Sequence, residues 1–404
     1  MKAKKLPVLN DPIYGFIHIA SPLIFDLLAH PFFQRLRRIA QMGFSSLVFP
    51  GARHSRFEHA LGAMHLMNLV VETLQKKGIK ISSDESEAMA IAILLHDIGH
   101  GPFSHALEKI ICLDIHHETL SLQLMEALND EFDGRLGLAI SIYKNTYPRK
   151  FMHQLVSSQL DVDRMDYLKR DSFYSGATEG NINTFRIIEM LNVVDDQLVV
   201  EEKGIFSIEK FIMARRLMYW QVYLHKTGLS SELLLAHLMR YVRKKLKNEI
   251  VPGLSEALHY FLSNDTIDVK SPEAINYFTQ MDDIDLLAGL KTWESNTDPI
   301  LAAYSKRLLH RDLLKMKFSD TPFKEKHLKE KRQHLVQSGC SDEFANSFVF
   351  SGQIGAQPYS LEAEPIMVLE KSGKIVRFEA FSNLFNGNSF IHNEIKHYLC
   401  YAKP

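Results

Sequence analysis

The chain has 404 residues, which is enough for one large domain or two of ordinary size around a substantial buried core. Hydrophobic residues make up 46% of it and charged residues 24%, a composition that excludes overall disorder. The 47 Lys and Arg residues nearly balance the 48 Asp and Glu residues, so no whole-molecule field favours nucleic acid or an anionic membrane. Any phosphate binding must therefore depend on local clusters.

The cysteines and the N-terminal segment indicate a cellular compartment. Cys112, Cys340 and Cys400 are too few and too scattered for a disulfide framework or a cysteine zinc site, which fits a reducing environment. The basic N-terminal segment lacks an apolar stretch, and Pro7 and Pro12 interrupt it before a signal peptide could form. No apolar run approaches the roughly 18 residues of a spanning helix. We therefore expect a cytoplasmic protein that does not bind a membrane.

The first hundred residues predict a series of helices. Apolar residues at helical spacing over residues 23–42 predict a short helix and, after the break at His30-Pro31, a second one. Ser55 and Glu58 form a capping-box pattern that opens the next helix. Lys76-Lys77-Gly78 is a suitable end for it, because cations lie near the negative end of the helix dipole and Gly can leave the helix.

A helix that starts near Asp84 runs through EAMAIAILLHDIGHG and is apolar on nearly all sides, so we expect it in the interior. Gly99, Gly101 and Pro102 end it abruptly. Further helices are predicted over HHETLSLQLMEALND and from about Asp161 in LDVDRMDYLKRD. This region is therefore predicted to be almost entirely helical.

The remaining sequence mixes helical and strand patterns. DQLVVEEKGIFSIE predicts a hairpin around a polar turn that contains Gly, and helical spacing then returns in SIEKFIMARRLMYWQVYLHK and SELLLAHLMRYVRKKLK. After about Val251 the pattern is more irregular, with a second predicted hairpin around Lys371-Ser372-Gly373 and a solvated basic helix at KEKHLKEKRQH. We expect a mainly α fold with small β-hairpins, a core over residues 1–246 and an irregular α+β lobe over 247–404 that can be continuous with the core.

Four side chains have the types and order of metal ligands: His59, His96, Asp97 and Asp163, on three predicted helices. Imidazole and carboxylate groups suit one divalent ion of iron, manganese, nickel, zinc or magnesium, and ligand chemistry does not choose among them. Asp97 in an apolar helix would be costly to bury unless a cation or a hydrogen-bond network met it. A single His or Asp at a helix end is more often a cap, but HDIGHGPFSH gathers three His and one Asp within ten residues.

The Gly- and Pro-rich exit from this helix supplies candidates for acid–base chemistry. His100, His105 and His117 can protonate a departing oxygen near neutral pH. Glu108 follows His105 by three residues and, in a helix, could orient its ring. A solvated His-rich loop is the alternative interpretation, above all for His116.

The segment DVDRMDYLKRD carries a second layer of polar residues. Asp163, Tyr167 and Asp171 recur every four positions and share one helical face, while Arg164 and Arg170 offer cations for phosphate oxygens. Alternating charges of this kind also occur on helices that merely face solvent. Spacing alone does not decide between these interpretations.

Together, RFEH, LLHDIGHGPFSH and DVDRMDYLKRD resemble the HD-domain deoxynucleoside triphosphate triphosphohydrolases, especially the group typified by the mammalian sterile-alpha-motif and HD-domain dNTPase. The resemblance includes NDPIYG, FQRLRRIAQMG and VFPGARHSRFEH and extends from about Asn10 to Lys315. We expect no sterile-alpha-motif domain, because the chain begins almost at the HD core. The resemblance implies that residues 1–246 form an HD phosphohydrolase core.

The resemblance implies roles for individual residues. His105 falls on the general acid toward the leaving oxygen, His100 and His117 on further active-site histidines, and Glu108 on a position where the nearest relatives carry Asp. The metal ligands are matched by His59, His96, Asp97 and Asp163. The positions that hold the sugar and the triphosphate are matched by Gln41, Arg56, Arg164, Tyr167, Asp171, Arg215 and Tyr223, with Arg164 in place of a Lys, and Leu224 stands where the relatives carry Gln.

The resemblance also implies a homo-oligomer, a dimer or tetramer, with a second nucleotide site at the subunit contacts. Parts of that effector site are matched by Asn10, Gln34, Arg37, Arg311 and Lys315. The acidic residue that reads guanine aligns with Ala29, and a phosphate-binding Lys aligns with Pro7. Without that carboxylate the N–H donors of guanine lose an acceptor, so we expect weak discrimination for guanine at a degenerate site.

The expected reaction is hydrolysis of a dNTP to deoxynucleoside and triphosphate at one divalent metal ion, with Mg²⁺ accompanying the nucleotide. Two alternatives stay open. The first is an HD phosphohydrolase that acts on another nucleotide or phosphoester, because one metal centre can serve several substrates. The second is a nucleotide-binding sensor with little turnover, and no feature indicates nucleic-acid binding.

Overall fold

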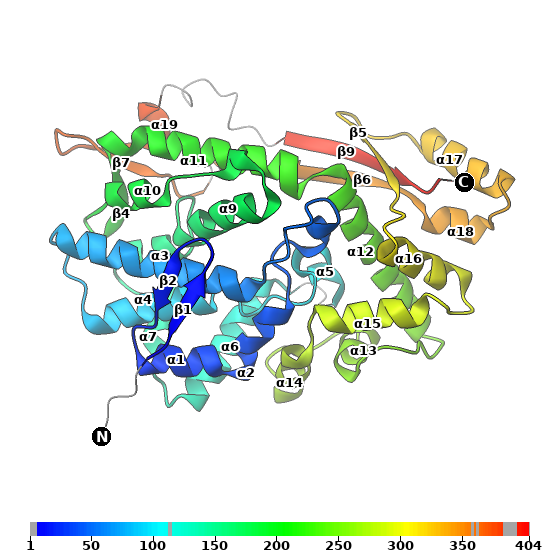
Figure 1. Ribbon diagram of the computed structural model, residues 1–404, viewed down its shortest axis with the longest axis horizontal. Helices are drawn as coiled ribbons and strands as arrows, with labels where there is room; N and C mark the ends of the chain where they lie inside the picture. The colour runs from blue at the N-terminus through cyan, green and yellow to red at the C-terminus, as the bar shows by residue number, and fades with distance from the viewer. Residues whose placement is uncertain (1–5, 112–114, 357–358, 361–362, 383–393, 404) are drawn as a thin grey trace.

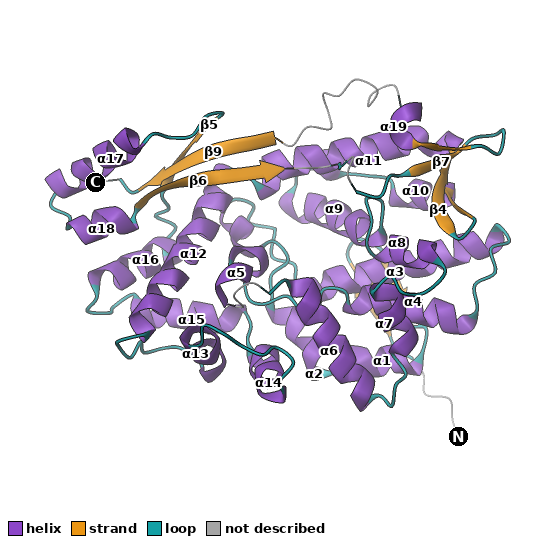
Figure 2. Ribbon diagram, turned by 180° about the vertical axis from the view of Figure 1, so that it is seen from behind, coloured by secondary structure: helices purple, strands orange, loops and turns teal. Residues whose placement is uncertain are grey.

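The computed structural model describes residues 6–111, 115–356, 359–360, 363–382 and 394–403. The fold is mainly α-helical, with a bundle at one end and a smaller α+β part at the other (Figures 1 and 2). The bundle packs around the long helix α3 and consists of α1 (Pro22–Ala29), α2 (Pro31–Gln34), α3 (Arg56–Lys76), α4 (Ser83–Leu95), α6 (His117–Glu131), α7 (Gly137–Tyr143), α8 (Lys150–Val156), α9 (Val162–Ser175) and α10 (Thr184–Met190). The short helix α5 (Glu108–Ile111) packs instead on helices of the second half of the chain.

The helices that follow lead from the bundle to the C-terminal lobe. Their bounds are α11 (Ile205–Met218), α12 (Lys226–Leu246), α13 (Glu256–Ser263), α14 (Pro272–Gln280), α15 (Asp283–Trp293), α16 (Pro299–Leu309), α17 (Glu325–Gln337), α18 (Asp342–Ser347) and α19 (Phe378–Phe381). This lobe contains more helix than its irregular sequence pattern indicates. None of the described helices combines the length and apolarity needed to cross a bilayer.

The strands of the described residues form three small sheets. A hairpin pairs β1 (Val8–Asp11) with β2 (Gly15–His18), and a second sheet has the order β5-β9-β6, from Lys315–Ser319, Glu394–Tyr401 and Val349–Ala356. A third sheet has the order β3-β4-β7-β8, from Leu191–Val194, Gln197–Glu201, Met367–Leu369 and Ile375–Arg377. In the third sheet β4 pairs in parallel with β7, so strands from both sides of the predicted boundary at 246 share one sheet.

Local sequence explains how the first helices begin and end. The predicted capping box of Ser55 and Glu58 is present at the start of α3, and Gly78 with φ +90 follows its end. A second capping box starts α4, where the backbone N–H of Ser82 donates to Glu85 at 2.9 Å. The segment after the His30-Pro31 break is only a single turn of α2 followed by a 3₁₀ turn, shorter than predicted.

The hairpin predicted in DQLVVEEKGIFSIE is wrong, because only its first half is a strand. Its first half is β4, but the partner is the preceding strand β3, and the turn is Asp195-Asp196 with φ +51 and +56. Two consecutive residues of positive φ make the type I′ turn that suits the twist of a hairpin. The second half starts α11 instead, because Ile205, Ile208 and Ile212 recur at helical spacing and are buried.

Helix α4 lies in the interior, as predicted. Its residues Met89, Ile91, Ile93 and Leu94 are each at most 1% exposed. Burial of one such side chain contributes about 1.5–3 kcal/mol, so α4 is held firmly on several sides. The residues that follow α4 therefore start from a fixed point.

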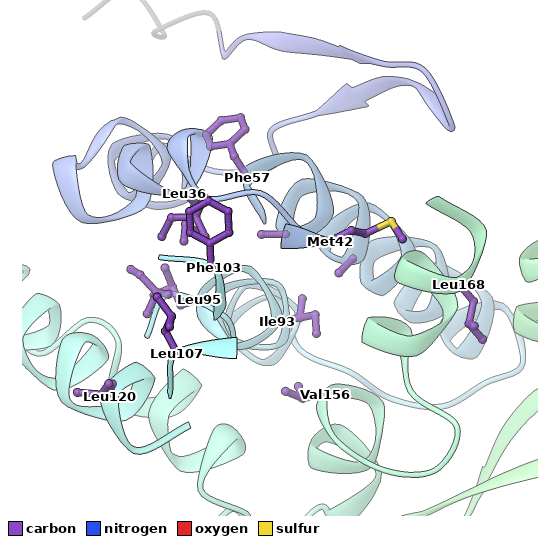
Figure 3. Packing of buried hydrophobic residues seen from close by; sticks show 14 of the residues in the cluster. Leu36, Met42, Phe57, Ile93, Leu95, Phe103, Leu107, Leu120, Val156 and Leu168 are labelled. Carbon is purple, nitrogen blue, oxygen red and sulfur yellow. The ribbon is translucent and has the colours of Figure 1, made fainter. Parts of the chain in front are cut away.

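Residues 98–104, which we call the exit turn, are strained and tied to distant segments. Phe103 and Ser104 have φ of +49 and +42, a conformation that costs non-glycine residues on the order of 1–3 kcal/mol each. The Phe103 ring is buried among residues such as Leu36 and Leu95 (Figure 3). Its backbone N–H donates to Asp283 Oδ1 at 2.7 Å, and Asp283 Oδ2 accepts from Ala40 N–H at 2.8 Å.

Helices α3 and α9 approach closely at Gly62. A Cβ at this position would lie 2.0 Å from Asp166 Oδ1 and 2.2 Å from Arg170 Nη2. Arg170 grips Asp166 with two hydrogen bonds, Nε to Oδ2 at 2.9 Å and Nη2 to Oδ1 at 3.0 Å, and both side chains are fully buried. The glycine is therefore required by the ion pair beneath it.

We expect Gly62→Ala to lower the free energy of unfolding by at least about 1–3 kcal/mol, because the methyl group overpacks a buried ion pair. Urea denaturation measures this change. Gly228→Ala in α12 is the matched control, since the nearest atom to its new Cβ is Ser45 Oγ at 3.9 Å. The control should gain up to about 1 kcal/mol from better helix propensity. Equal effects of the two substitutions would contradict the argument.

We also expect Asp283 to make stability depend on pH. Burial raises its pKa from 3.8 to about 6, although the N–H groups of Ala40 and Phe103 act in the opposite direction. A raised pKa means that the contribution of the group is fully present below its unfolded value and is lost as the pH rises through the folded value. The loss is about 1.4 kcal/mol for each pH unit between these two pKa values.

Urea denaturation of the wild type and of Asp283→Asn across this pH range tests the expectation. The free energy of unfolding of the wild type minus that of the variant should fall by up to about 3 kcal/mol as the pH rises. The variant also leaves one backbone N–H without an acceptor, which lowers its stability by about 1–3 kcal/mol at every pH. A difference that does not change with pH would show that Asp283 does not titrate there.

Candidate metal centre

The four predicted ligands meet at one point between α3, the end of α4 and α9. His59 Nε2 lies 3.1 Å from Asp163 Oδ1 and 3.7 Å from Asp97 Oδ2. His96 Nε2 lies 3.3 Å from Asp97 Oδ1 and 3.4 Å from Asp163 Oδ1. The ligand atoms of His59, His96 and Asp163 all lie within 4.8 Å of one another. Nitrogen and oxygen donors at this spacing can converge on a single ion.

Hydrogen bonds fix the tautomers of both histidines. His96 Nδ1 lies 2.6 Å from the Ile93 carbonyl oxygen, and His59 Nδ1 lies 2.8 Å from Asp166 Oδ2. Because these oxygens only accept, both Nδ1 atoms carry a proton, and in the neutral ring each Nε2 atom presents a lone pair. Within the described residues neither Nε2 atom makes a hydrogen bond. A lone pair that faces a carboxylate at 3.1 Å is repulsive unless a proton or a cation lies between the two atoms.

The electrostatics favour positive charge at this point. Burial opposes protonation of His59, but the carboxylates of Asp163 and Asp166 raise its pKa to about 10. Burial likewise opposes ionisation of Asp163, but His59 and His96 hold its pKa well below its usual range. A divalent ion can take the place of the proton that these groups would otherwise share. The donor set therefore fits a divalent metal.

Asp97 connects this group with the exit turn. Its Oδ2 accepts from Arg56 Nη1, and its Oδ1 lies 3.2 Å from His100 Nε2. Burial raises the pKa of Asp97, but His96, His100 and Arg56 together hold it well below its usual range. Asp97 is thus an ionised carboxylate that touches both His96 and His100, and it can join a metal through either oxygen.

The predicted acid–base residues lie beside Asp97. The rings of His100 and His117 stack with centroids 4.0 Å apart, and Glu108 Oε1 accepts from His117 Nδ1 at 2.9 Å and from its backbone N–H at 2.7 Å. His105 falls in a 3₁₀ turn, but its side chain, and so its predicted contact with Glu108, lies outside the described residues. A small hollow adjoins these groups and is lined by His100, Glu108, His117 and Phe278, among others.

A second cluster of predicted residues surrounds Asp171. Its Oδ2 accepts from Tyr223 Oη at 2.7 Å, and its Oδ1 lies 2.7 Å from His54 Nε2. The Tyr167 ring lies edge-on to Tyr223, with centroids 6.3 Å apart. Burial raises the pKa of Tyr167, and Arg215 opposes this rise. Asp171, Tyr167 and Tyr223 therefore form one connected polar wall.

Unused donors and acceptors mark the space between these clusters. Arg164 pairs with Asp161, the N-cap of α9, and Arg56 Nε donates to Ser104 Oγ at 2.8 Å. Within the described part of the chain, several buried polar atoms have no hydrogen-bond partner, and those on predicted substrate residues are Gln41 Oε1, Arg164 Nε and Arg215 Nε. Buried polar atoms are rarely left without partners unless a ligand or water completes them.

The sequence analysis misses two residues of this centre, and a third has a different role from the predicted one. Asp166 fixes the His59 tautomer and His54 holds Asp171, although neither belongs to the predicted set. The spacing of Asp166 from Asp163 and Arg170, three and four residues, was the available signal. The expectation that Arg170 binds phosphate is wrong, because its guanidinium is fully buried between Asp166 and Asp11.

The predicted effector residues do not form one group within this chain. Arg37 Nε donates to Gln34 Oε1 at 2.9 Å, and the Arg37 guanidinium lies 3.5 Å from the centroid of the Phe57 ring. Asn10 is exposed on β1, whereas Arg311 and Lys315 are exposed in the C-terminal lobe, where Arg311 Nε donates to the Leu47 carbonyl. Within the described part of the chain a hydrogen bond joins Gln34 and Arg37, and the effector site as a whole stays a prediction.

Comparisons with known proteins agree with this geometry. The pattern of the HD domain matches residues 56–171, which include all four predicted ligands, and that of the HD associated region matches residues 182–251. The fold is similar to the crystal structure of a phosphohydrolase from Bacteroides thetaiotaomicron, with a TM-score of 0.94 and 45% identity over 99% of this chain and 100% of that one.

Two curated relatives extend the comparison. The chain is 33% identical over 317 residues to the uncharacterized protein YwfO of Bacillus subtilis, which covers 77% of this chain and 72% of that protein. It is also 33% identical over 253 residues to the deoxynucleoside triphosphate triphosphohydrolase SAMHD1 homolog of Dictyostelium discoideum, which covers 58% of this chain and 49% of that protein. The ligand geometry and these likenesses together show that the chain belongs to the HD-domain phosphohydrolase family.

Proposed function

We propose that this protein hydrolyses a deoxynucleoside triphosphate to the deoxynucleoside and triphosphate in a metal-dependent reaction. The observation that carries the proposal is the pair of fixed tautomers: the buried lone pairs of His59 and His96 face Asp163 and Asp97. The likeness to a deoxynucleoside triphosphate triphosphohydrolase from Dictyostelium discoideum supports the choice of substrate. Of the predicted phosphate and sugar residues, Arg56 contacts the predicted ligand Asp97 directly.

His59, His96, Asp97 and Asp163 would hold one divalent ion. When bound, that ion supplies Lewis-acid stabilisation of negative charge on the phosphate. Mg²⁺ would arrive with the triphosphate, as it commonly does with nucleotides. The ligand set suits iron, manganese, nickel, zinc or magnesium, so the proposal does not depend on one metal.

Three arginines would neutralise the triphosphate. Arg56 already touches the ligand Asp97, which places a guanidinium directly beside the metal group. Arg164 and Arg215 each keep a buried Nε–H without a partner among the described residues, and phosphate oxygens are suitable acceptors for it. In a site that excludes water, these fixed donors stabilise charge that grows as the P–O bond breaks.

The leaving group is the 5′-oxygen of the deoxyribose, which needs a proton as its bond to the α-phosphorus breaks while water adds to that phosphorus. We assign this proton to His105, with His100 and His117 stacked nearby on Asp97 and Glu108. The hydrogen bond from His117 Nδ1 to Glu108 Oε1 fixes the His117 ring against that of His100. The products are then the deoxynucleoside and triphosphate.

The sugar would lie against Tyr167 and Tyr223, with Asp171 as an acceptor for a hydroxyl group. His54 and Tyr223 hold the two oxygens of Asp171 in place, so this wall is fixed before the substrate binds. Gln41 has a buried Oε1 without a partner among the described residues and can accept from the nucleoside. We further propose that the enzyme is a homo-oligomer, in which a subunit contact could bring the scattered effector residues together.

The proposed reaction is tested by incubating each of the four dNTPs with the metal-loaded enzyme in water enriched in ¹⁸O. We expect deoxynucleoside and triphosphate in equal amounts, with the label in the triphosphate, because water adds to the α-phosphorus. Release of orthophosphate or pyrophosphate without triphosphate would refute the assignment. Turnover of nucleoside monophosphates or ribonucleotides with none of dNTPs would favour the broader phosphohydrolase alternative.

His96→Ala provides the matching loss-of-function test. Removal of a ligand should lower turnover by more than about 100-fold, a larger effect than second-layer substitutions produce. His259→Ala is the control, because His259 is exposed on α13 in the C-terminal lobe. Turnover that survives His96→Ala at the level of the control would mean that the chemistry takes place elsewhere.

A further inference from the structure

An uninterrupted set of buried hydrogen bonds leads from the N-terminal hairpin to the metal centre. Asp11 ends β1 and its Oδ2 accepts from Arg170 Nη1 at 2.8 Å. Arg170 grips Asp166 at both oxygens, and Asp166 in turn accepts from His59 Nδ1 at 2.8 Å. We call Asp11, Arg170, Asp166 and His59 the ion chain. Its exposed fractions are 5% for Asp11 and 0% for the other three residues.

The charges along the ion chain alternate. Asp11 and Asp166 are negative and Arg170 between them is positive, so one net negative charge remains behind the His59 ring. Burial opposes the charge on Arg170, but Asp166 and Asp11 hold its pKa above its usual range. Without Asp11, Asp166 would be the only one of the two carboxylates left to pair with the Arg170 guanidinium. Asp166 would then be a weaker acceptor for His59, whose Nε2 would become a weaker donor to a metal.

We propose that Asp11 and Arg170 are positioning residues, which set the metal affinity of His59 through Asp166 and so place the N-terminal hairpin in control of the metal centre. The inference rests on the metal centre of the proposed function but not on its substrate. The hairpin is well placed for this, because β2 packs on α3 (Figure 1) and its residue Ile17 is fully buried. A substitution in the hairpin would therefore change the metal affinity of His59 although the hairpin does not contact His59 itself.

The second oxygen of Asp11 allows the charge to be separated from the local fold. Asp11 Oδ1 accepts from the N–H groups of Ile13 and Tyr14 at 2.8 and 3.0 Å, which shapes the turn between β1 and β2. In Asp11→Asn the amide oxygen can keep these two bonds while the charge toward Arg170 is lost. The substitution therefore tests the ion chain rather than the turn.

Asp298 offers a matched control at the other end of the molecule. Its Oδ1 caps α16 by accepting from Ile300 and Leu301 N–H at 2.9 and 3.1 Å, and its Oδ2 pairs with Lys245 Nζ at 2.7 Å. It thus combines a backbone cap and a cation in the same way as Asp11 does. Asp298→Asn removes the same charge without touching the ion chain.

The experiment titrates the metal-free full chain with Co²⁺ alone and follows the visible absorption of bound Co²⁺, with Mn²⁺ calorimetry as a second measurement. We expect Asp11→Asn to raise the Kd about 10-fold or more, in the range of substitutions behind a metal-bound histidine, and to change the Co²⁺ spectrum. Asp298→Asn should match the wild type. Asp11→Glu, which restores the charge, should recover part of the affinity.

A double-mutant cycle separates transmission from general loosening. In an Asp166→Asn background, Asp11→Asn should have little further effect on the Kd, because the connection to His59 is already broken. An unchanged Kd in Asp11→Asn, an equal loss in both backgrounds, or the same loss in Asp298→Asn would each overturn the inference. If Asp11→Asn does not fold, Arg170→Lys is measured instead, and an unchanged Kd there would have the same meaning.

The outcome is independent of the nucleotide assay. Loss of Co²⁺ affinity in Asp11→Asn would support the ion chain even if no dNTP were hydrolysed. Conversely, the enzyme could hydrolyse dNTPs while Asp11→Asn leaves the Kd for Co²⁺ unchanged. This result would leave the proposed function intact but contradict the role of the hairpin. The two conclusions can therefore fail separately.

Discussion

The neutralisation of buried charge at His59 and His96 is the constraint on which the rest of the structure depends. The carboxylates of Asp97 and Asp163 come within 3.1–3.7 Å of the Nε2 atoms of His59 and His96, and both imidazole rings are largely buried. Unpaired charge in such a place costs several kcal/mol. The arrangement is therefore stable only with a proton or a metal ion between these groups and with fixed partners behind the predicted ligands, which here are Arg56, Asp166 and the Ile93 carbonyl.

These partners explain why the surrounding helices pack as they do. The buried pair of Arg170 and Asp166 needs space between α3 and α9, and Gly62 provides it. Asp161 accepts from Arg164 N–H at 2.8 Å and so sets where α9 begins, which places Asp163 in its first turn and Asp166 one turn later. The positions of the predicted ligands thus depend on the Asp161 cap and on Gly62 as well as on the ligand residues themselves.

The sequence predicts those features that are local. Capping boxes, apolar periodicity and HDIGHGPFSH give the helices and the family, and the resemblance then gives four predicted ligands whose side chains lie together in the structure. Asp166 and His54 escape notice because their partners lie 107 and 117 residues away. The β3–β4 hairpin is misjudged because two Asp residues of positive φ form the turn, while the glycine that looked like a turn precedes a helix.

The exit turn shows why a local pattern cannot specify the whole site. Phe103 and Ser104 hold a conformation that their own sequence disfavours, and Ser104 accepts from Arg56 beside the metal group. The restraint comes from far along the chain: Asp283 holds the Phe103 N–H, and the buried Arg35 joins the carbonyls of Ile98 and Met281 at 2.7 and 3.0 Å. Hydrogen bonds to the C-terminal lobe therefore help to stabilise the conformation of the exit turn. Substitutions in the lobe should therefore move Arg56 by altering the backbone of the exit turn, not by altering the charge near Arg56.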